Sequence, residues 1–205
     1  MNRRLDALQD WLTGQSELWF SFHRQVDAGR MPLENGWDEG RESAESTINP
    51  FVYRELNFAA LSLDGAGVTS YGPFAITLRD ETIEDRATAF EENPFFFNKR
   101  HKLYGGMIPP KGYRSTWAER ARLAVAKLHG KIAAGTAPEA FPVTLMEDRR
   151  DEPDCDFIEV HIYGPVNRQS IARVVGQVPA KPADRLIWKS VKKRLLAQGT
   201  EVQVA

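Results

Sequence analysis

The sequence predicts an α+β fold, with helices and strands that lack the regular alternation of a doubly wound sheet. Apolar residues recur at helical spacing near both ends of the chain and alternate with polar ones in its middle. The composition is that of an ordinary globular protein, with 42% apolar and 27% charged residues among 205. Without an internal repeat or a long linker, we expect a single domain spanning 1–205.

The N-terminal part is expected to be helical. Residues 5–12 and 18–26 carry apolar side chains at helical spacing, with a break at Gly14 between them. The second segment also permits a strand. Residues 31–50 are polar and contain two glycines and two prolines, so we expect a long loop there, of the kind that is often functional.

The middle of the chain is expected to form strands first and then a helix. Residues 52–90 alternate between apolar and polar side chains after turn signals, which is typical of strands. Residues 93–113 mix aromatic residues with glycine and proline pairs and are expected to be irregular. Thr116 and Glu119 form a capping box, and the apolar stripe behind it predicts a helix that ends near Gly135.

The last third of the chain is expected to alternate strands with short helices. Its strands are marked by branched aliphatic residues and its helices by polar caps. The expected elements are a strand at 141–146, an acidic loop at 147–156, a strand at 157–163, a helix capped by Asn167 that runs to Val175, a helix capped by Asp184 that ends near Gly199, and a strand at 200–205.

Several classes of protein are disfavoured. Cys155 is the single cysteine, which excludes an intramolecular disulfide and zinc sites built on two or four cysteines. The four histidines show no metal-ligand spacing, so we expect no metal site. The chain lacks the nucleophile elbow of serine hydrolases, the P-loop, and a dinucleotide-binding glycine motif after a strand.

The N-terminal segment and the hydropathy predict a cytoplasmic protein. Arg3 and Arg4 are followed by Asp6 and Asp10 instead of the apolar stretch of a signal peptide. No run approaches the 18 apolar residues that a membrane span needs. We therefore expect no contact with a membrane.

Charge is segregated along the chain although the net charge is only -1. Segment 95–131 holds nine Lys or Arg against one acidic residue, and segment 181–194 holds six against one. Acidic residues gather at 34–45, 80–92 and 147–159. The basic segments could steer an anionic partner, or they could be solvated helix faces that pair with the acidic segments after folding.

The strand at 157–163 carries the most suggestive set of polar residues. With a period of two, Ile158, Val160 and Ile162 face one way, which we expect to be the core. A carboxylate, an imidazole and a phenol then share the opposite face, contributed by Glu159, His161 and Tyr163. Such a row suits a strand that lines a cleft, and the alternative is the solvated outer face of an edge strand.

Several segments together resemble an uncharacterised bacterial family with the fold of ADP-ribosyltransferase toxins. The segments are Phe22-His23-Arg24, VYRELNF at 52–58, SYGPFAITL at 70–78, Arg86-Ala87-Thr88 and FIEVHIYGPV at 157–166. The resemblance implies two small antiparallel sheets behind a helical N-terminal part, with NAD bound as a substrate in the cleft between them. It also implies a toxin or defence effector that transfers ADP-ribose to a protein or nucleic acid, and an antitoxin protein as a further partner.

The resemblance also implies roles for individual residues. Glu159 is the position that fits the catalytic acid, which stabilises the positive charge that develops on the ribose as nicotinamide leaves. His23 or Arg24 would contact the adenosine or the pyrophosphate, and Tyr71 would stack on the nicotinamide. Arg54 and His161 complete the expected NAD-binding set.

Two other functions stay open from the residues alone. The first is a non-enzymatic nucleic-acid-binding protein that uses the basic segments 95–131 and 181–194. The second is a metal-dependent nuclease, because Asp156 and Glu159 border a strand, although His161 stands where the lysine of such enzymes is expected.

Overall fold

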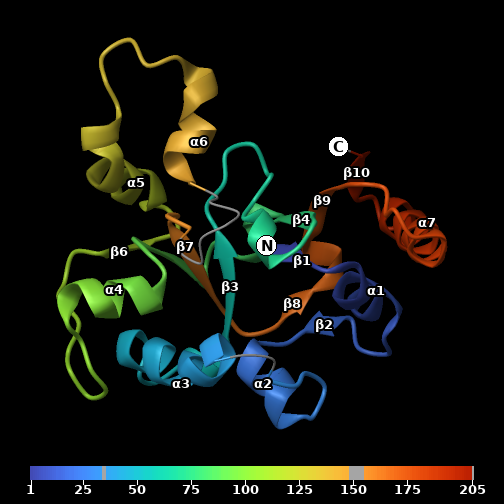
Figure 1. The fold of residues 1–205 in the computed structure, drawn as a ribbon, viewed down its shortest axis with the longest axis horizontal. Coiled ribbons are helices and arrows are strands. Elements are labelled where there is room, and N and C mark those ends of the chain that lie inside the picture. Colours follow the sequence, from blue (N-terminus) through green and yellow to red (C-terminus); the bar gives the residue numbers. More distant parts are fainter. Residues whose placement is uncertain (34–35, 148–154, 205) are drawn as a thin grey trace.

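The structure, a computed structural model, describes residues 1–33, 36–147 and 155–204. These residues form helices and three sheets of four, two and four strands, which confirms the α+β class (Figure 1). The strands pair in antiparallel fashion except for the last two along the chain, which run parallel. The two-stranded sheet and the parallel pair are additions to the two antiparallel sheets that we expected.

The first four-stranded sheet joins the two ends of the described chain. Its order is β1 (Asn2–Arg3), β4 (Phe74–Leu78), β9 (Ile171–Gly176) and β10 (Glu201–Val204). Helices α1 (Leu5–Thr13) and α7 (Pro182–Ala197) contact each other beside this sheet. The ring of Phe74 lies 4.8 Å from that of Trp188, so α7 is attached to the sheet by aromatic packing.

The second four-stranded sheet contains the strand with the suggestive polar row. Its order is β3 (Leu56–Ala60), β7 (Glu159–Tyr163), β5 (Ala87–Phe90) and β6 (Arg114–Thr116). The small sheet pairs β2 (Leu18–Trp19) with β8 (Val166–Asn167). Because β7 lies between β3 and β5, it is an inner strand, and the edge-strand alternative is wrong.

Both faces of β7 are covered. Val160 and Ile162 belong to the main core, which also takes side chains from α1, β4, β9 and α7. On the other face lie α3 (Gly36–Ile48) and α4 (Pro94–His101), whose Ile48 and Phe97 pack with Phe90 of β5. Glu159 and His161 therefore point into a second, polar interior beneath these helices.

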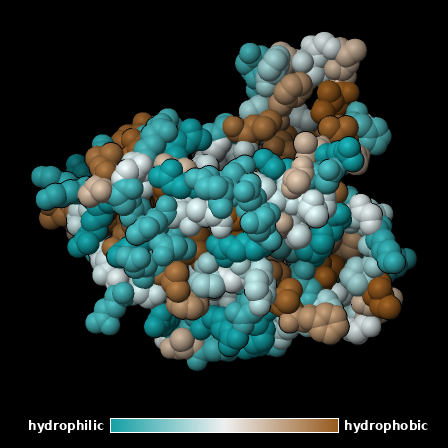
Figure 2. Space-filling view, turned by 180° about the vertical axis from the view of Figure 1, so that it is seen from behind, coloured by the Kyte–Doolittle hydropathy of each residue, from teal (hydrophilic) through white to brown (hydrophobic). Residues whose placement is uncertain are grey.

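The remaining helices lie at the periphery. Helix α2 (Phe22–Asp27) lies near α3, and α5 (Arg120–Leu128) and α6 (Phe141–Leu145) form an arm that projects from the body (Figure 1). Figure 2 shows hydrophobic side chains on this arm, where Val125 and Val143 are exposed. None of the helices in the described part of the chain has the length and apolar character to cross a membrane.

The prediction of a loop at 31–50 is wrong over most of its length, because residues 36–48 form α3. The face that α3 buries includes Ala44 and Ile48, but it also carries Arg41 and Glu45 at helical spacing. Since two of these four positions are charged, the apolar periodicity that normally marks a helix is missing from the sequence.

Other expected elements also differ in kind. Residues 94–101 are helical, begun by the cap of Asn93 and by Pro94. Phe141–Leu145 is a helix in place of a strand, with Pro142 in its first turn. Asn167 caps only a short 3-10 turn, and the β-branched run after it forms β9 instead of a helix.

The helix expected after the capping box is shorter than predicted. Thr116 ends strand β6 and does not cap α5, which begins at Arg120 and ends at Leu128. The predictions of α1, β10 and the central strand are confirmed, as is that of a helix before Gly199. This helix, α7, begins at Pro182 after Lys181, so Asp184 lies in its first turn and is not its cap. Most of the acidic loop expected at 147–156 lies outside the described residues.

Candidate functional site

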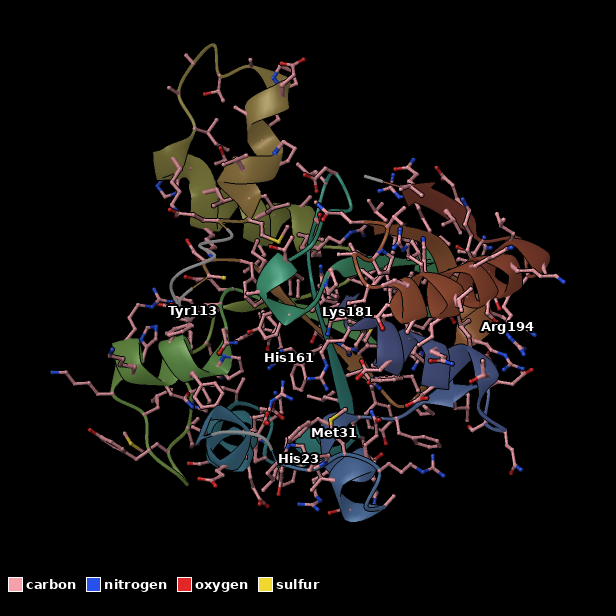
Figure 3. All side chains as sticks on the ribbon, turned by 45° about the vertical axis from the view of Figure 1, so that its right-hand side comes forward. His23, Met31, Tyr113, His161, Lys181 and Arg194 are labelled. Atoms are coloured by element: carbon pink, nitrogen blue, oxygen red, sulfur yellow. The ribbon has the colours of Figure 1, made fainter. Side chains whose placement is uncertain are left out.

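A cluster of polar side chains fills the space between β7 and helices α2, α3 and α4. We call it the Glu159 cluster. Its members are Glu159, His161, Arg114, Asn49, Asn93, Arg41, Glu45, His23 and Tyr71. Figure 3 shows His161 at the centre of the molecule and His23 on the α2 side.

The pleat of β7 places Glu159 and His161 on the same face of the strand. The Nε2 atom of His161 lies 2.9 Å from Oε1 of Glu159. Both residues are buried, with exposed fractions of 2% for His161 and 5% for Glu159. The imidazole lies against the rings of Phe58 and Phe90, on the two neighbouring strands, at centroid distances of 5.0 and 5.4 Å.

Hydrogen bonds define the tautomer of His161. Arg114 Nη1 lies 3.1 Å and Asn49 Nδ2 3.3 Å from the Nδ1 atom. Both groups are donors, so Nδ1 is the acceptor and the ring proton sits on Nε2, which donates to Glu159. Burial first and the charge of Arg114 second lower the pKa of His161 well below its ordinary value. His161 is therefore neutral, and both of its ring nitrogens are engaged in hydrogen bonds.

Glu159 is an unusual carboxyl group because it is buried among both charges and neutral donors. Asn93 Nδ2 lies 3.4 Å from its Oε2 atom, and the same amide accepts the Phe95 N–H as the cap of α4. Burial raises the pKa of Glu159 well above its ordinary value, and the negative charge of Glu45 raises it further. Arg41 and Arg114 act in the opposite direction. A cationic ligand next to this group would favour its ionised form.

Helices α2 and α3 supply the second half of the cluster. His23 Nε2 lies 2.8 Å from Oε2 of Glu45, and Arg41 Nε lies 3.1 Å from Oε1 of the same carboxylate. The guanidinium of Arg41 also lies over the ring of Phe22, 4.4 Å from its centroid. Because each carboxylate oxygen of Glu45 has a partner, the position of this group is fixed, and so is its electrostatic effect on Glu159.

Tyr71 approaches the cluster from the turn before β4. It ends the short 3-10 helix Thr69–Tyr71, and its residue exposure is 51%. Its hydroxyl forms a hydrogen bond with the side chain of Asn93, the residue that also contacts Glu159. Burial first and the charge of Glu159 second raise the pKa of Tyr71 to about 12.

The structure brings together four of the six residues that the sequence singled out, Glu159, His161, His23 and Tyr71. The other two are engaged elsewhere. Arg24 pairs with Glu55, and Arg54 pairs with Asp27 and Glu42. These pairs lie at the surface and stabilise the start of β3 against α2. His23 is buried although it belongs to the short peripheral helix α2, with an exposed fraction of 7%.

Five members of the cluster were not expected from the sequence. Three of them carried a signal in the sequence. Arg41 and Glu45 have the i, i+4 spacing of an ion pair on a helix. The Asn93-Pro94 pair is typical of a helix start, where the side-chain amide of the capping asparagine is held by the helix backbone. Asn49 and Arg114 carried none, since only the pairing of β5 with β6 brings Arg114 to His161.

A shallow pocket of about 260 Å³ borders the cluster. Two of its walls are Phe90, the cross-strand partner of Glu159, and Arg114. Its other lining residues are Ile48 and the segment 109–113. Ligand pockets for drug-sized molecules start near this volume, so one aromatic ring would fit and a dinucleotide would extend beyond it.

Asp156, one of the two carboxylates considered for a metal nuclease, is engaged by basic residues. Asp156 is bound by Lys127 and Lys131, and these lysines lower its pKa against the effect of burial. Within residues 1–33, 36–147 and 155–204, no three His, Cys, Asp or Glu side chains are placed to hold a metal ion.

Comparisons of the chain with protein-family models, curated proteins and solved structures find no significant match.

Proposed function

We propose that the protein is an NAD-dependent ADP-ribosyltransferase with Glu159 as its catalytic carboxylate. The observation that carries the proposal is the placement of Glu159 on an inner strand. There its two oxygens are held by His161 and Asn93, and Tyr71 lies beside it. In this reaction the bond between nicotinamide and ribose breaks, and nicotinamide leaves with the bonding electrons. A fixed anion stabilises the positive charge that develops on the ribose.

The raised pKa of Glu159 supports a role with a cationic substrate. In the free protein, burial and Glu45 favour the protonated carboxyl group. The nicotinamide ring of NAD carries a positive charge, so its arrival favours loss of the proton and formation of the carboxylate. Burial then strengthens the attraction between carboxylate and sugar cation, because the surroundings are less polar than water.

Other members of the cluster would position Glu159 and the substrate. His161 holds one carboxylate oxygen and is itself fixed by Arg114 and Asn49. The exposed part of the Tyr71 ring would stack on nicotinamide, as the resemblance implies. His23 acts indirectly, by holding Glu45, and Arg24 and Arg54 are left outside the proposed catalytic set because carboxylates already bind them.

The proposal is tested with the purified chain and NAD labelled in the adenine ring. We expect free nicotinamide to accumulate and the label to move to a macromolecule when a cell lysate supplies the acceptor. Digestion with protease or nuclease then identifies the acceptor class. Intact NAD after incubation with lysate would overturn the proposal, and release of nicotinamide without transfer would reduce it to NAD hydrolysis.

The proposal includes a partner that keeps such a toxin inactive in the cell that makes it. Co-purification of the tagged chain from its native host should then yield an antitoxin protein that lowers nicotinamide release. A host that tolerates the free active chain would contradict this part.

A further inference from the structure

We infer that one face of α7 binds the phosphate backbone of a nucleic acid. We call this face the α7 basic stripe and define it as Lys181, Arg185, Lys189 and Lys193. The inference is independent of the NAD chemistry, because it concerns a different part of the molecule. Figures 1 and 3 show α7 on the side of the molecule opposite α4 and Tyr113, and Figure 3 labels Lys181 and Arg194 near its two ends.

The stripe follows from helical spacing. Its members recur every four residues, which places them on one side of a helix, at a rise of about 6 Å from each to the next. All four are exposed, and Lys192 and Arg194 add charge beside them. A neighbouring side of α7 is buried through Trp188, Val191 and Leu195. Packing against the core therefore fixes the direction in which the stripe points.

The stripe differs from the larger part of the other basic segment in the ion pairs that its residues form within the described parts of the chain. In segment 95–131, five of the nine cations bind carboxylates: Arg100, Arg120, Arg122, Lys127 and Lys131. Most of those carboxylates come from the acidic segments at 80–92 and 147–159. For the α7 stripe, the described parts of the chain show no ion pair. Folding thus neutralises much of the basic segment 95–131 and leaves the α7 basic stripe free to bind an external anion.

The chemistry of the stripe favours a nucleic acid over a membrane or an acidic protein. A membrane-binding helix inserts a continuous apolar face into lipid. The apolar face of α7 formed by Trp188, Val191 and Leu195 is buried in the core, and the exposed Leu186 and Leu196 lie apart from each other on the helix. Protein interfaces usually centre on aromatic anchors, and the exposed side of α7 carries no aromatic residue. A row of regularly spaced cations matches the regularly spaced charges of a phosphodiester chain.

The test uses two fluorescent probes, a 20-nucleotide single-stranded RNA and a 20-base-pair DNA duplex. The full chain is titrated into each at several salt concentrations. We expect affinity that falls with salt, and a triple variant R185Q/K189Q/K193Q should lower the slope of log affinity against log salt by about one for each lost contact. The matched control R30Q/K99Q/K102Q removes the same charge elsewhere and should leave the slope almost unchanged.

Three results would overturn the inference. The first is absence of binding to both probes at low salt. The second is an equal loss of affinity in the two triple variants, which would show that net charge alone attracts the probe. The third is equal or stronger binding to polyglutamate or to phosphatidylserine vesicles, which would assign the stripe to another anionic surface. Circular dichroism of the variants checks that they remain folded.

Discussion

The carboxylate of Glu45, on helix α3, raises the pKa of Glu159, on strand β7. Two acidic residues from distant parts of the chain thus share one buried site. His23 and Arg41 hold the first, and His161 and Asn93 hold the second. A negative charge near a carboxyl group disfavours its ionisation, so Glu159 keeps its proton to higher pH. The pH dependence of the protein should report this pairing.

Removing the charge of Glu45 should shift the activity towards acid. In Glu45→Gln the carboxyl of Glu159 loses a negative neighbour, so its pKa falls and the active carboxylate forms at lower pH. The midpoint of the rise of nicotinamide release with pH is the measurement. Glu39→Gln, an exposed change on the same helix, serves as the control. An unchanged or higher midpoint in Glu45→Gln would show that the two carboxyl groups do not interact.

The stability of the protein should carry the same signature. Because burial raises the pKa of Glu159, the folded protein keeps a proton that the unfolded chain has released. The stability linked to this proton is complete below the ordinary pKa of 4.5 and is lost as the pH rises through the folded value. Glu159→Gln has no such loss. The free energy of unfolding of this variant, relative to that of the wild type, should therefore increase as the pH rises from 4.5 to 8.

Urea unfolding at several pH values measures this difference. Glu84→Gln, an exposed change, should give a difference from wild type that does not vary with pH. A difference for Glu159→Gln that is also flat, or that falls as the pH rises, would refute the raised pKa.

Replacing His161 should destabilise the fold strongly. In His161→Phe the groups of Glu159, Asn49 and Arg114 all lose a partner in a buried site. We expect a loss of about 3 kcal/mol in the free energy of unfolding, because buried hydrogen-bonding groups are left without a partner. The loss should shrink as the pH falls below 6.5. In that range the imidazole of the unfolded wild type takes up a proton that the folded wild type does not bind, which lowers the stability of the wild type alone. His129→Phe, at an exposed helix end, should cost less than about 0.5 kcal/mol, and an equal cost would count against the network.

Gly72 should resist substitution because it places Tyr71. Its φ is +145°, and a Cβ atom there would lie 2.3 Å from the backbone carbon of Arg3. Gly72→Ala should cost about 2 kcal/mol or more through strain and overlap. Gly105→Ala is the control, since a Cβ atom there meets nothing within 4 Å. Thermal unfolding of both variants decides the point, and similar melting temperatures would contradict it.

The sequence predicts the parts of the fold in which the buried face is apolar. Strand β7 and helices α1 and α7 follow from periodicity alone, as does the placement of Glu159 and His161 on one face. Helix α3 escapes prediction because its buried face carries Arg41 and Glu45, whose partners come from other elements. The cluster was therefore only half predictable, since its remaining members depend on how α3, α4 and β6 are brought to β7.

The rate of nicotinamide release in Glu159→Gln tests the central claim most directly. This variant keeps the size of the side chain and the hydrogen-bonding oxygen but removes the charge. We predict a fall of about 100-fold or more relative to wild type and to Glu84→Gln, with all three proteins folded and NAD saturating. Equal rates in Glu159→Gln and wild type would contradict the assignment of Glu159 as the catalytic carboxylate.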